Sequence, residues 1–257
     1  MHNNDVETIE YKGCTIRIVP HDSPESPREW DNLGTMTCSH RNYNLGDEQI
    51  ECSGKEYLRD KAAQITTVYE QTRDLEIRTN TALRRVDDWN HAWYRGLQDS
   101  HATRLEKILD KAIDEHFIIL PLYLMDHSGL SISTGSFSCP WDSGRVGIIY
   151  CPMAKARKEY KGTDIEIRKK AIKCMQGEVA TYDSYLRGDV VGYIAEDPDE
   201  EQIASCWGFY PDDSAGYSKR WDDPIDQAKA EIDGWVEDQE KEAVERKYWE
   251  AREVITE

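Results

Sequence analysis

The chain has 257 residues, of which 39% are hydrophobic and 32% are charged. This balance is typical of a folded globular protein and excludes a disordered one, and the chain is long enough to bury a sizeable apolar core. Fifty acidic residues against 32 basic ones give a formal charge of −18. Non-specific binding to nucleic acid or to an anionic membrane needs clustered Lys and Arg, so the charge opposes both and favours a protein partner with a basic surface.

Cysteine usage and the absence of long apolar stretches indicate a reducing compartment. No C-x-x-C pair occurs among the seven cysteines, which are Cys14, Cys38, Cys52, Cys139, Cys151, Cys174 and Cys206. Neither a disulfide framework nor a structural zinc cluster is indicated, so we expect free thiols. The N-terminus shows no basic region followed by an apolar run, and no apolar stretch approaches the roughly 18 residues of a membrane span. We therefore expect a cytoplasmic protein.

Alternating apolar and polar residues predict two strand pairs. Residues 6–19 form the first pair, with a turn at Lys12-Gly13, and residues 189–210 form the second as a β-hairpin. A proline-rich loop follows the first pair, and residues 35–40 then return to strand.

Two short apolar runs, residues 117–125 and 145–151, are typical of buried strands, and we expect them to pair. Pro121 has no backbone N–H to donate to a neighbouring strand. The first run is therefore predicted to lie at a sheet edge, or to contain a bulge, at that residue.

Apolar residues spaced by three and four predict helices. Residues 55–116 contain two or three of them, or an antiparallel helical hairpin. A capping box of Thr163 and Glu166 begins a further helix, which ends at Gly188 and should cover the sheet. Residues 226–257 predict a last helix. Its apolar stripe is broken and consists of Ile232, Trp235, Val236, Val244 and Tyr248.

These elements predict an α+β fold, with a mainly antiparallel sheet covered by helices and interrupted by a helical insertion. Residues 1–51 and 117–210 form the expected core, residues 52–116 the insertion, and residues 211–257 an acidic C-terminal helical segment. Acidic residues are concentrated late in the chain, because residues 197–240 contain fourteen Asp or Glu against three Lys or Arg.

Four short segments are unusually rich in Trp, Asp, Ser, His and Gly. They are PREWDNLG (residues 27–34), DHSG (126–129), CPWDSG (139–144) and CWGFY (206–210). Polar groups that follow a buried strand lie at its exposed end, where a rigid scaffold presents them to a ligand. Because DHSG and CPWDSG lie between the two apolar strands, we expect them to adjoin in space and to face a common pocket.

The amino-acid sequences of these segments resemble those of an uncharacterised protein family of phages and mobile elements. The resemblance rests on ESPREWDNLGTM, YNLGDE, LPLYLMDHSGLSISTGSFSCPWDSGRVGIIY, GEVATYDSYLRGDVVGY and CWGFY, which together cover roughly a third of the chain. It implies a genomic setting, without an activity. The helical insertion and the acidic segment after Tyr210 lie outside the matching stretches.

Two enzymatic interpretations of the motifs remain open. Cys139 and His127 would form a nucleophile and its base, oriented by Asp126 or Asp142, since a thiol needs a nearby imidazole to become a thiolate. Alternatively Asp31, Asp126, His127 and Asp142 would ligate a divalent cation that activates water. No compact metal-ligand spacing and no standard nucleotide-binding loop occurs, so we predict no metal and no cofactor. In the structural interpretation, Cys139 is a small buried residue and the polar side chains cap their own turns.

A binding interpretation agrees better with the charge. The residues expected to contact a ligand are Trp30, Asp31, Asn32, Ser128, Trp141, Ser143 and Trp207. Trp30 or Asp31 is expected to reach the same pocket as DHSG and CPWDSG. We expect a phage or mobile-element accessory protein that binds a host protein, as an inhibitor of a defence system through its acidic surface, with a small hydrolase-like or metal-dependent enzyme as the alternative. The sequence leaves the oligomeric state open.

Overall fold

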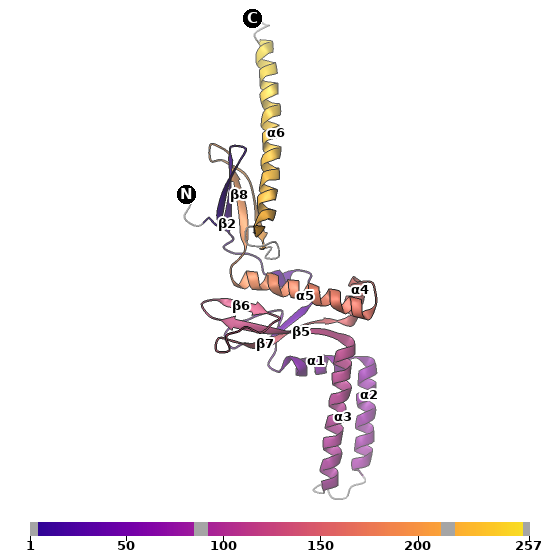
Figure 1. The fold of residues 1–257 in the computed structure, drawn as a ribbon. Helices are drawn as coiled ribbons and strands as arrows, with labels where there is room; N and C mark the ends of the chain where they lie inside the picture. The colour runs from indigo at the N-terminus through magenta and orange to yellow at the C-terminus, as the bar shows by residue number, and fades with distance from the viewer. Residues whose placement is uncertain (1–4, 85–91, 212–218, 254–257) are drawn as a thin grey trace. The chain divides into compact units, whose positions relative to one another are not determined.

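The described residues form an α+β fold with two β-sheets, which confirms the predicted fold class (Figure 1). The computed structural model describes residues 5–84, 92–211 and 219–253. Its strands are β1 (Glu7–Tyr11), β2 (Cys14–Pro20), β3 (Thr35–Cys38), β4 (Glu48–Gln49), β5 (Phe117–Asp126), β6 (Leu130–Ser133), β7 (Ser143–Pro152), β8 (Val191–Glu196) and β9 (Gln202–Phe209). Its helices are the 3-10 turn η1 (Pro27–Glu29), α1 (Gly54–Ala63), α2 (Thr66–Leu83), α3 (Ala92–His116), α4 (Met153–Glu159), α5 (Asp164–Leu186) and α6 (Asp222–Glu253).

The two sheets belong to two compact units of the chain. Residues 1–27 and 181–257 form unit 1, and residues 28–180 form unit 2. This division differs from the single core with an insertion and a tail that we expected from the sequence. The reason is strand pairing, because β2 hydrogen-bonds to β8 and so joins the N-terminus to the last third of the chain. Alternation along a strand fixes which face is apolar, but not which distant strand becomes its neighbour.

Unit 1 contains a four-stranded antiparallel sheet in the order β1-β2-β8-β9. The predicted turn at Lys12-Gly13 joins β1 and β2, and both residues have the positive φ that a two-residue hairpin turn requires, 51° and 84°. Helix α6 covers one face of this sheet with its first half, through the buried side chains of Ile225, Ala228 and Ile232. From residue 237 to residue 249, every side chain of α6 is exposed.

Unit 2 contains a five-stranded sheet in the order β4-β3-β7-β5-β6, antiparallel except for the pair of β3 and β4. The two apolar runs pair as predicted, as β5 and β7. Strand β6 pairs only with the residues from Tyr123 to Asp126, so Pro121 lies where β5 is an edge strand, and a register shift follows at Leu122 and Tyr123. Both expectations for Pro121 are confirmed.

Helices cover both faces of this sheet, as Figure 1 shows for α5 on one side and α1 on the other. The predicted capping box begins α5, since the backbone N–H of Thr163 donates to Glu166 at 2.8 Å, and Gly188 ends the helix with a φ of 73°. Met175 of α5 packs near Gly34 and Ile149, which confirms that this helix covers the sheet.

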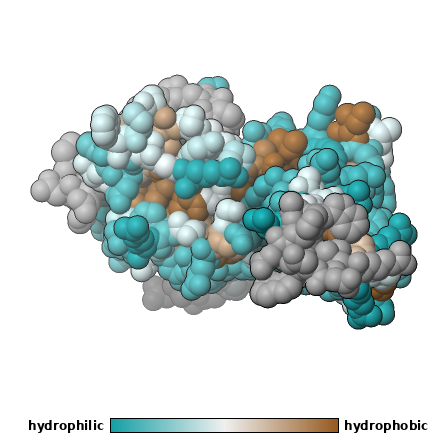
Figure 2. Space-filling model, turned by 90° about the horizontal axis from the view of Figure 1, so that it is seen from below, coloured by the Kyte–Doolittle hydropathy of each residue, from teal (hydrophilic) through white to brown (hydrophobic). Residues whose placement is uncertain are grey.

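Helices α2 and α3 form the predicted antiparallel hairpin, which leads away from the five-stranded sheet (Figure 1). Only its base joins the core, where Val68, Ala112 and Ile113 pack against α1 and the sheet. Figure 2 shows hydrophobic residues as small separate areas among hydrophilic ones on the face in view. Among the described helices, none combines the length and the apolar character needed to cross a membrane.

Candidate functional site

DHSG and CPWDSG lie side by side at one end of the five-stranded sheet, as predicted. The end of β5 and the start of β7 are adjacent, with Met125 opposite Ser143. The backbone N–H of Asp126 donates to the carbonyl of Asp142 at 2.8 Å, and His127 Nδ1 lies 3.1 Å from Asp142 Oδ2. A register set by two neighbouring antiparallel strands therefore brings the two motifs together.

Most polar groups of the two motifs bind within their own turns. The Cys139 thiol donates to Asp142 Oδ2 at 3.4 Å, and the Ser143 hydroxyl donates to the carbonyl of Cys139. Ser128 has a left-handed φ of 58°, and the backbone N–H of His127 donates to the carbonyl of Gly129 at 3.1 Å. These contacts match the structural interpretation, in which Asp and Ser cap local turns.

A polar pocket of about 380 Å³ opens beside these turns. It is lined by Ser39, His40, Leu124, Asp126, Trp141, Asp142, Ser143, Gly144, Arg145 and Val146. A second cavity of about 410 Å³ shares Ser39, Arg145 and Val146 with it and extends toward the start of α1. Trp141 lies at the rim with 92% of its surface exposed, whereas most Trp side chains in folded proteins are highly buried.

The geometry does not favour the nucleophilic interpretation. A catalytic thiol needs an imidazole or a cation next to its sulfur. Here Asp142 Oδ2 contacts both the Cys139 thiol and the His127 ring, so the thiol donates to a carboxylate and not to the imidazole. His127 itself is 70% exposed, so no packing holds its ring toward the sulfur.

The proposed convergence of Asp31 with the pocket is wrong. Residues 30–32 precede β3, whose first residue, Thr35, pairs with Tyr150 at the far end of β7. The pocket lies at the opposite end of β7, around Ser143. Trp30, Asp31 and Asn32 therefore do not contribute to it. Within the part of the chain that the structure describes, no group of three or more His, Cys, Asp or Glu is arranged to hold a metal ion.

The PREWDNLG segment instead forms a buried ion network. Arg28 donates to both carboxylate oxygens of Asp47, at 2.9 and 2.7 Å, and lies 3.4 Å from Glu178. Glu178 also accepts the backbone N–H of Leu33 at 2.6 Å and that of Gly34 at 3.1 Å. Burial alone lowers the pKa of Arg28, but the two carboxylates outweigh it and raise the pKa.

This network gives a structural reason for the charged residues in these motif segments. Its three charged residues come from PREWDNLG, YNLGDE and GEVATYDSYLRGDVVGY, three of the stretches that carry the resemblance. Asn32 also helps to hold this loop in place. Its side-chain amide donates to the carbonyl of Trp30, and its backbone carbonyl accepts from Lys155 at 2.6 Å. The composition of the segment thus reflects structural anchoring of the loop on α4 and α5.

Trp207, the last of the expected binding residues, belongs to unit 1. Its ring packs against His21 with 5.4 Å between centroids, and it covers Gly192, where an added Cβ would lie 2.3 Å from the indole. Trp207 is half-exposed and packs at the rim of the unit 1 sheet, as Trp side chains commonly do.

The cysteines are free thiols, as predicted, and all seven lie within the described residues. Burial raises the pKa of Cys38 to about 12 and that of Cys151 to about 11. Both thiols are therefore protonated and unreactive near neutral pH.

Three residues in or beside the pocket were not among the predicted site residues. His40 and Arg145 line it, and the Tyr43 hydroxyl donates to the carboxylate of Asp126, which raises the pKa of Tyr43. His40 and Tyr43 come from the loop after β3, and Arg145 comes from the start of β7. Only the spatial order of β3 and β7 in the sheet reveals that these segments meet.

The acidic segment of unit 1 is exposed along most of its described length. Asp199, Glu200 and Glu201 are exposed in the β8–β9 turn, where the carboxylate of Asp197 accepts the backbone N–H groups of Asp199 and Glu201 at 2.9 Å each. On α6 the exposed acidic residues are Asp222, Asp223, Asp226, Glu231, Glu237, Asp238 and Glu240. Asp212 and Asp213 lie outside the described residues.

Comparisons of the chain with protein-family models, with curated proteins and with solved structures found no match.

Proposed function

We propose that this protein acts by binding a protein partner with a basic surface, and that it serves a phage or mobile element as an accessory protein that inhibits a host defence system. The observation that supports the binding role is Trp141, a fully exposed indole at the rim of a pocket that contains two carboxylates. The setting rests on the resemblance of the motif segments.

Trp141, Asp126 and Asp142 offer the chemistry that recognises Lys or Arg. A cation above an indole face gains about 0.5–1 kcal/mol at an exposed site, and a charge-assisted hydrogen bond to a carboxylate adds to it. Trp is also among the residues that dominate the free energy of binding at protein interfaces. Arg145 lines the same pocket and suits a carbonyl or carboxylate, so we expect a peptide segment of a protein rather than an isolated cation.

The acidic surface of unit 1 supports the same class of partner. Its exposed carboxylates on the β8–β9 turn and on α6 attract Lys and Arg and raise the association rate at low salt. Carboxylates placed in this way stand in for the phosphates of a nucleic acid, and a defence enzyme with a nucleic-acid channel is the kind of target that they suit.

The hydrolase-like alternative is not favoured by a specific observation. The Cys139 thiol donates to the carboxylate of Asp142, and the Ser143 hydroxyl donates to the carbonyl of Cys139 in its own turn. Neither side chain contacts a base in the way that a nucleophile requires.

Short peptides that differ at one central position provide the test. Binding of fluorescently labelled peptides with Arg, Lys or the uncharged analogue citrulline at that position is measured by polarisation. We expect the Arg and Lys peptides to bind and Trp141→Ala to weaken their binding by about tenfold or more. Trp30→Ala is the matched control, because Trp30 is half-exposed at the opposite end of the same sheet and should bind as the parent does.

Equal affinity of the parent and the Trp141→Ala protein for these peptides would contradict the role of the pocket. The defence role is tested separately, by expressing either protein in bacteria that carry a defence system and counting phage plaques. The parent should restore plaque formation, and no restoration in any defence-carrying strain would argue against an inhibitor.

A further inference from the structure

The α2–α3 hairpin has no core of its own. Along its described length beyond the base, from Tyr69 to Arg84 and from Arg95 to Lys111, no side chain is buried. The apolar residues of the seam, Leu75, Leu83, Leu97, Leu105 and Ile108, are all half-buried. Two helices in contact form a single layer, so neither side of their seam is covered, whereas stable helical proteins pack such seams against further helices.

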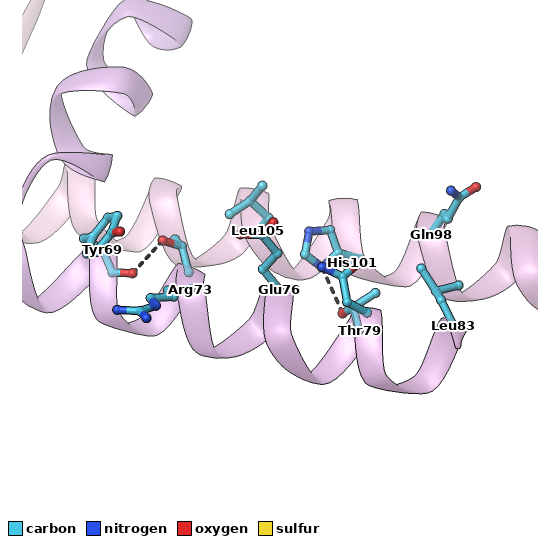
Figure 3. Close-up of a pocket in the computed structure, with 10 residues that line it drawn as sticks. Tyr69, Arg73, Glu76, Thr79, Leu83, Gln98, His101 and Leu105 are labelled. Carbon is cyan, nitrogen blue, oxygen red and sulfur yellow. Dashed lines mark hydrogen bonds between the residues drawn. The ribbon is translucent and has the colours of Figure 1, made fainter. Parts of the chain in front are cut away.

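One side of the seam forms an open groove of about 660 Å³ (Figure 3). At its centre Thr79 Oγ1 and His101 Nδ1 share a hydrogen bond of 2.9 Å between the two helices. Leu83 of α2 and Leu105 of α3 also line it, and Tyr69, at 54% exposure, adds an exposed ring near the base. The groove therefore offers partly exposed apolar surface along both helices.

The charge of this region suits a second copy of the same chain. Residues 55–115 contain eleven Lys or Arg and twelve Asp or Glu, so the hairpin is almost neutral in a chain with a charge of −18. Two copies that meet through their hairpins therefore avoid most of the repulsion between like-charged surfaces.

The groove also carries a self-complementary pair of charges. Arg73 and Glu76 lie three residues apart on α2, on neighbouring turns, and both line the groove (Figure 3). In a twofold symmetric contact, residue i of one copy meets residue j of the other and the reverse also holds. Arg73 of each copy would then meet Glu76 of its partner, which gives two ion pairs related by the twofold axis.

We propose that the groove between α2 and α3 is a self-association surface, in which the hairpins of two copies pack antiparallel to form a four-helix bundle. The second hairpin covers Leu83 and Leu105 of each copy, the half-buried leucines that line the groove. This role is separate from the pocket at Trp141, which lies in the β5–β7 turns and shares no lining residue with the groove.

Sedimentation equilibrium of the full 29.7 kDa chain, over a roughly hundredfold range of concentration, tests the proposal. The parent should reach twice the chain mass as concentration rises. Glu76→Arg should weaken the dimer by at least about tenfold, because each Arg73 then faces the arginine introduced in the other copy, and like charges placed together are costly. The double variant Arg73→Glu with Glu76→Arg restores the complementary pairs and should dimerise as the parent does.

Mixing the two single variants gives a sharper test. Arg73→Glu and Glu76→Arg proteins should each be monomeric alone and should form a heterodimer together. Glu70→Arg is the matched control and should dimerise normally, since Glu70 is exposed on α2 but does not line this groove. A monomeric parent throughout the range, a Glu70→Arg protein as weak as Glu76→Arg, or single variants that fail to combine while retaining parental helix content by circular dichroism would each overturn the proposal.

Discussion

Two helical extensions of this protein differ in how they are packed. They are the α2–α3 hairpin of unit 2 and the second half of α6 in unit 1. Each hairpin helix contacts the other along its length, yet no described side chain beyond the base is buried. Helix α6 buries Ile225, Ala228 and Ile232 on its sheet and then continues as a single exposed helix. The comparison shows that helix length alone says little about how much a helix contributes to a core.

The two extensions also differ in charge. The hairpin region is nearly neutral, whereas residues 237–253 of α6 contain seven Asp or Glu against four Lys or Arg. A neutral open seam suits a second copy of the chain, and an acidic single helix suits a basic partner. Four changes test how far the two units differ, beginning with the largest expected effect.

Glu178→Ala should cost unit 2 about 3–5 kcal/mol of folding free energy, because it leaves Arg28 with one carboxylate fewer in a buried network. It also removes the acceptor for the backbone N–H groups of Leu33 and Gly34. Urea denaturation measures the loss. Glu178→Gln removes the charge but keeps an oxygen acceptor and should lose less, so equal losses in the two variants would mean that the charge of Glu178, and not its hydrogen bonds to Leu33 and Gly34, accounts for the stabilisation.

Truncation along α6 compares its two halves directly. Ile232→Ala should cost about 2–5 kcal/mol, because it leaves a cavity in the core of unit 1. Val244→Ala, the matched truncation at a side chain that is 69% exposed, should change stability by no more than about 0.5 kcal/mol. Thermal or urea unfolding of both proteins measures the difference, and comparable losses would show that the second half of α6 is covered in solution.

Two glycines at close contacts compare the sheets of the two units. An added Cβ at Gly147 would lie 1.9 Å from the carbonyl oxygen of Thr37, which the backbone cannot avoid. At Gly192 it would lie 2.3 Å from the half-exposed indole of Trp207, which can turn aside, and 2.8 Å from the carbonyl oxygen of Cys206, a milder backbone contact than the one at Gly147. We expect Gly147→Ala to cost about 3 kcal/mol and Gly192→Ala about 1 kcal/mol by urea denaturation. The reverse order would mean that Trp207 is held more rigidly than strand β3.

The smallest expected effect is at the base of the hairpin. Hydrogen bonds from Arg59 and then Lys55 lower the pKa of Asp110 from 3.8 to about 2. Because the pKa is lower in the folded protein, the stabilisation is present above pH 3.8 and is lost as the pH falls toward 2. The carboxylate is 38% exposed, so solvent screening limits its contribution to about 0.2–1 kcal/mol.

Asp110→Asn should therefore lower the unfolding midpoint slightly at pH 7 and leave it unchanged near pH 2. Measuring the midpoint of the parent and the variant at both pH values separates this ion pair from the many other carboxylates. A constant difference at the two pH values would exclude the titration of Asp110 as its cause.

The sequence by itself determined the local structure of this protein. The turn at Lys12-Gly13, the capping box of Thr163 and Glu166, and the interruption at Pro121 each depend on residues that are close together in the chain. The adjacency of DHSG and CPWDSG also followed from the sequence, because the two strands they join are neighbours.

The tertiary structure alone decided what depends on contacts between distant segments. The pairing of β2 with β8 separates the chain into two units, and the position of β3 beside β7 places Tyr43 and His40 near Asp126 but Asp31 at the opposite end. Along α6, Ile232 is buried and Val244 is exposed, because the described residues of the sheet pack against the first half of the helix and every side chain from residue 237 to residue 249 is exposed. Alternation and helical periodicity specify which face of an element is apolar, whereas the partner of that face is set by the packing of the whole chain.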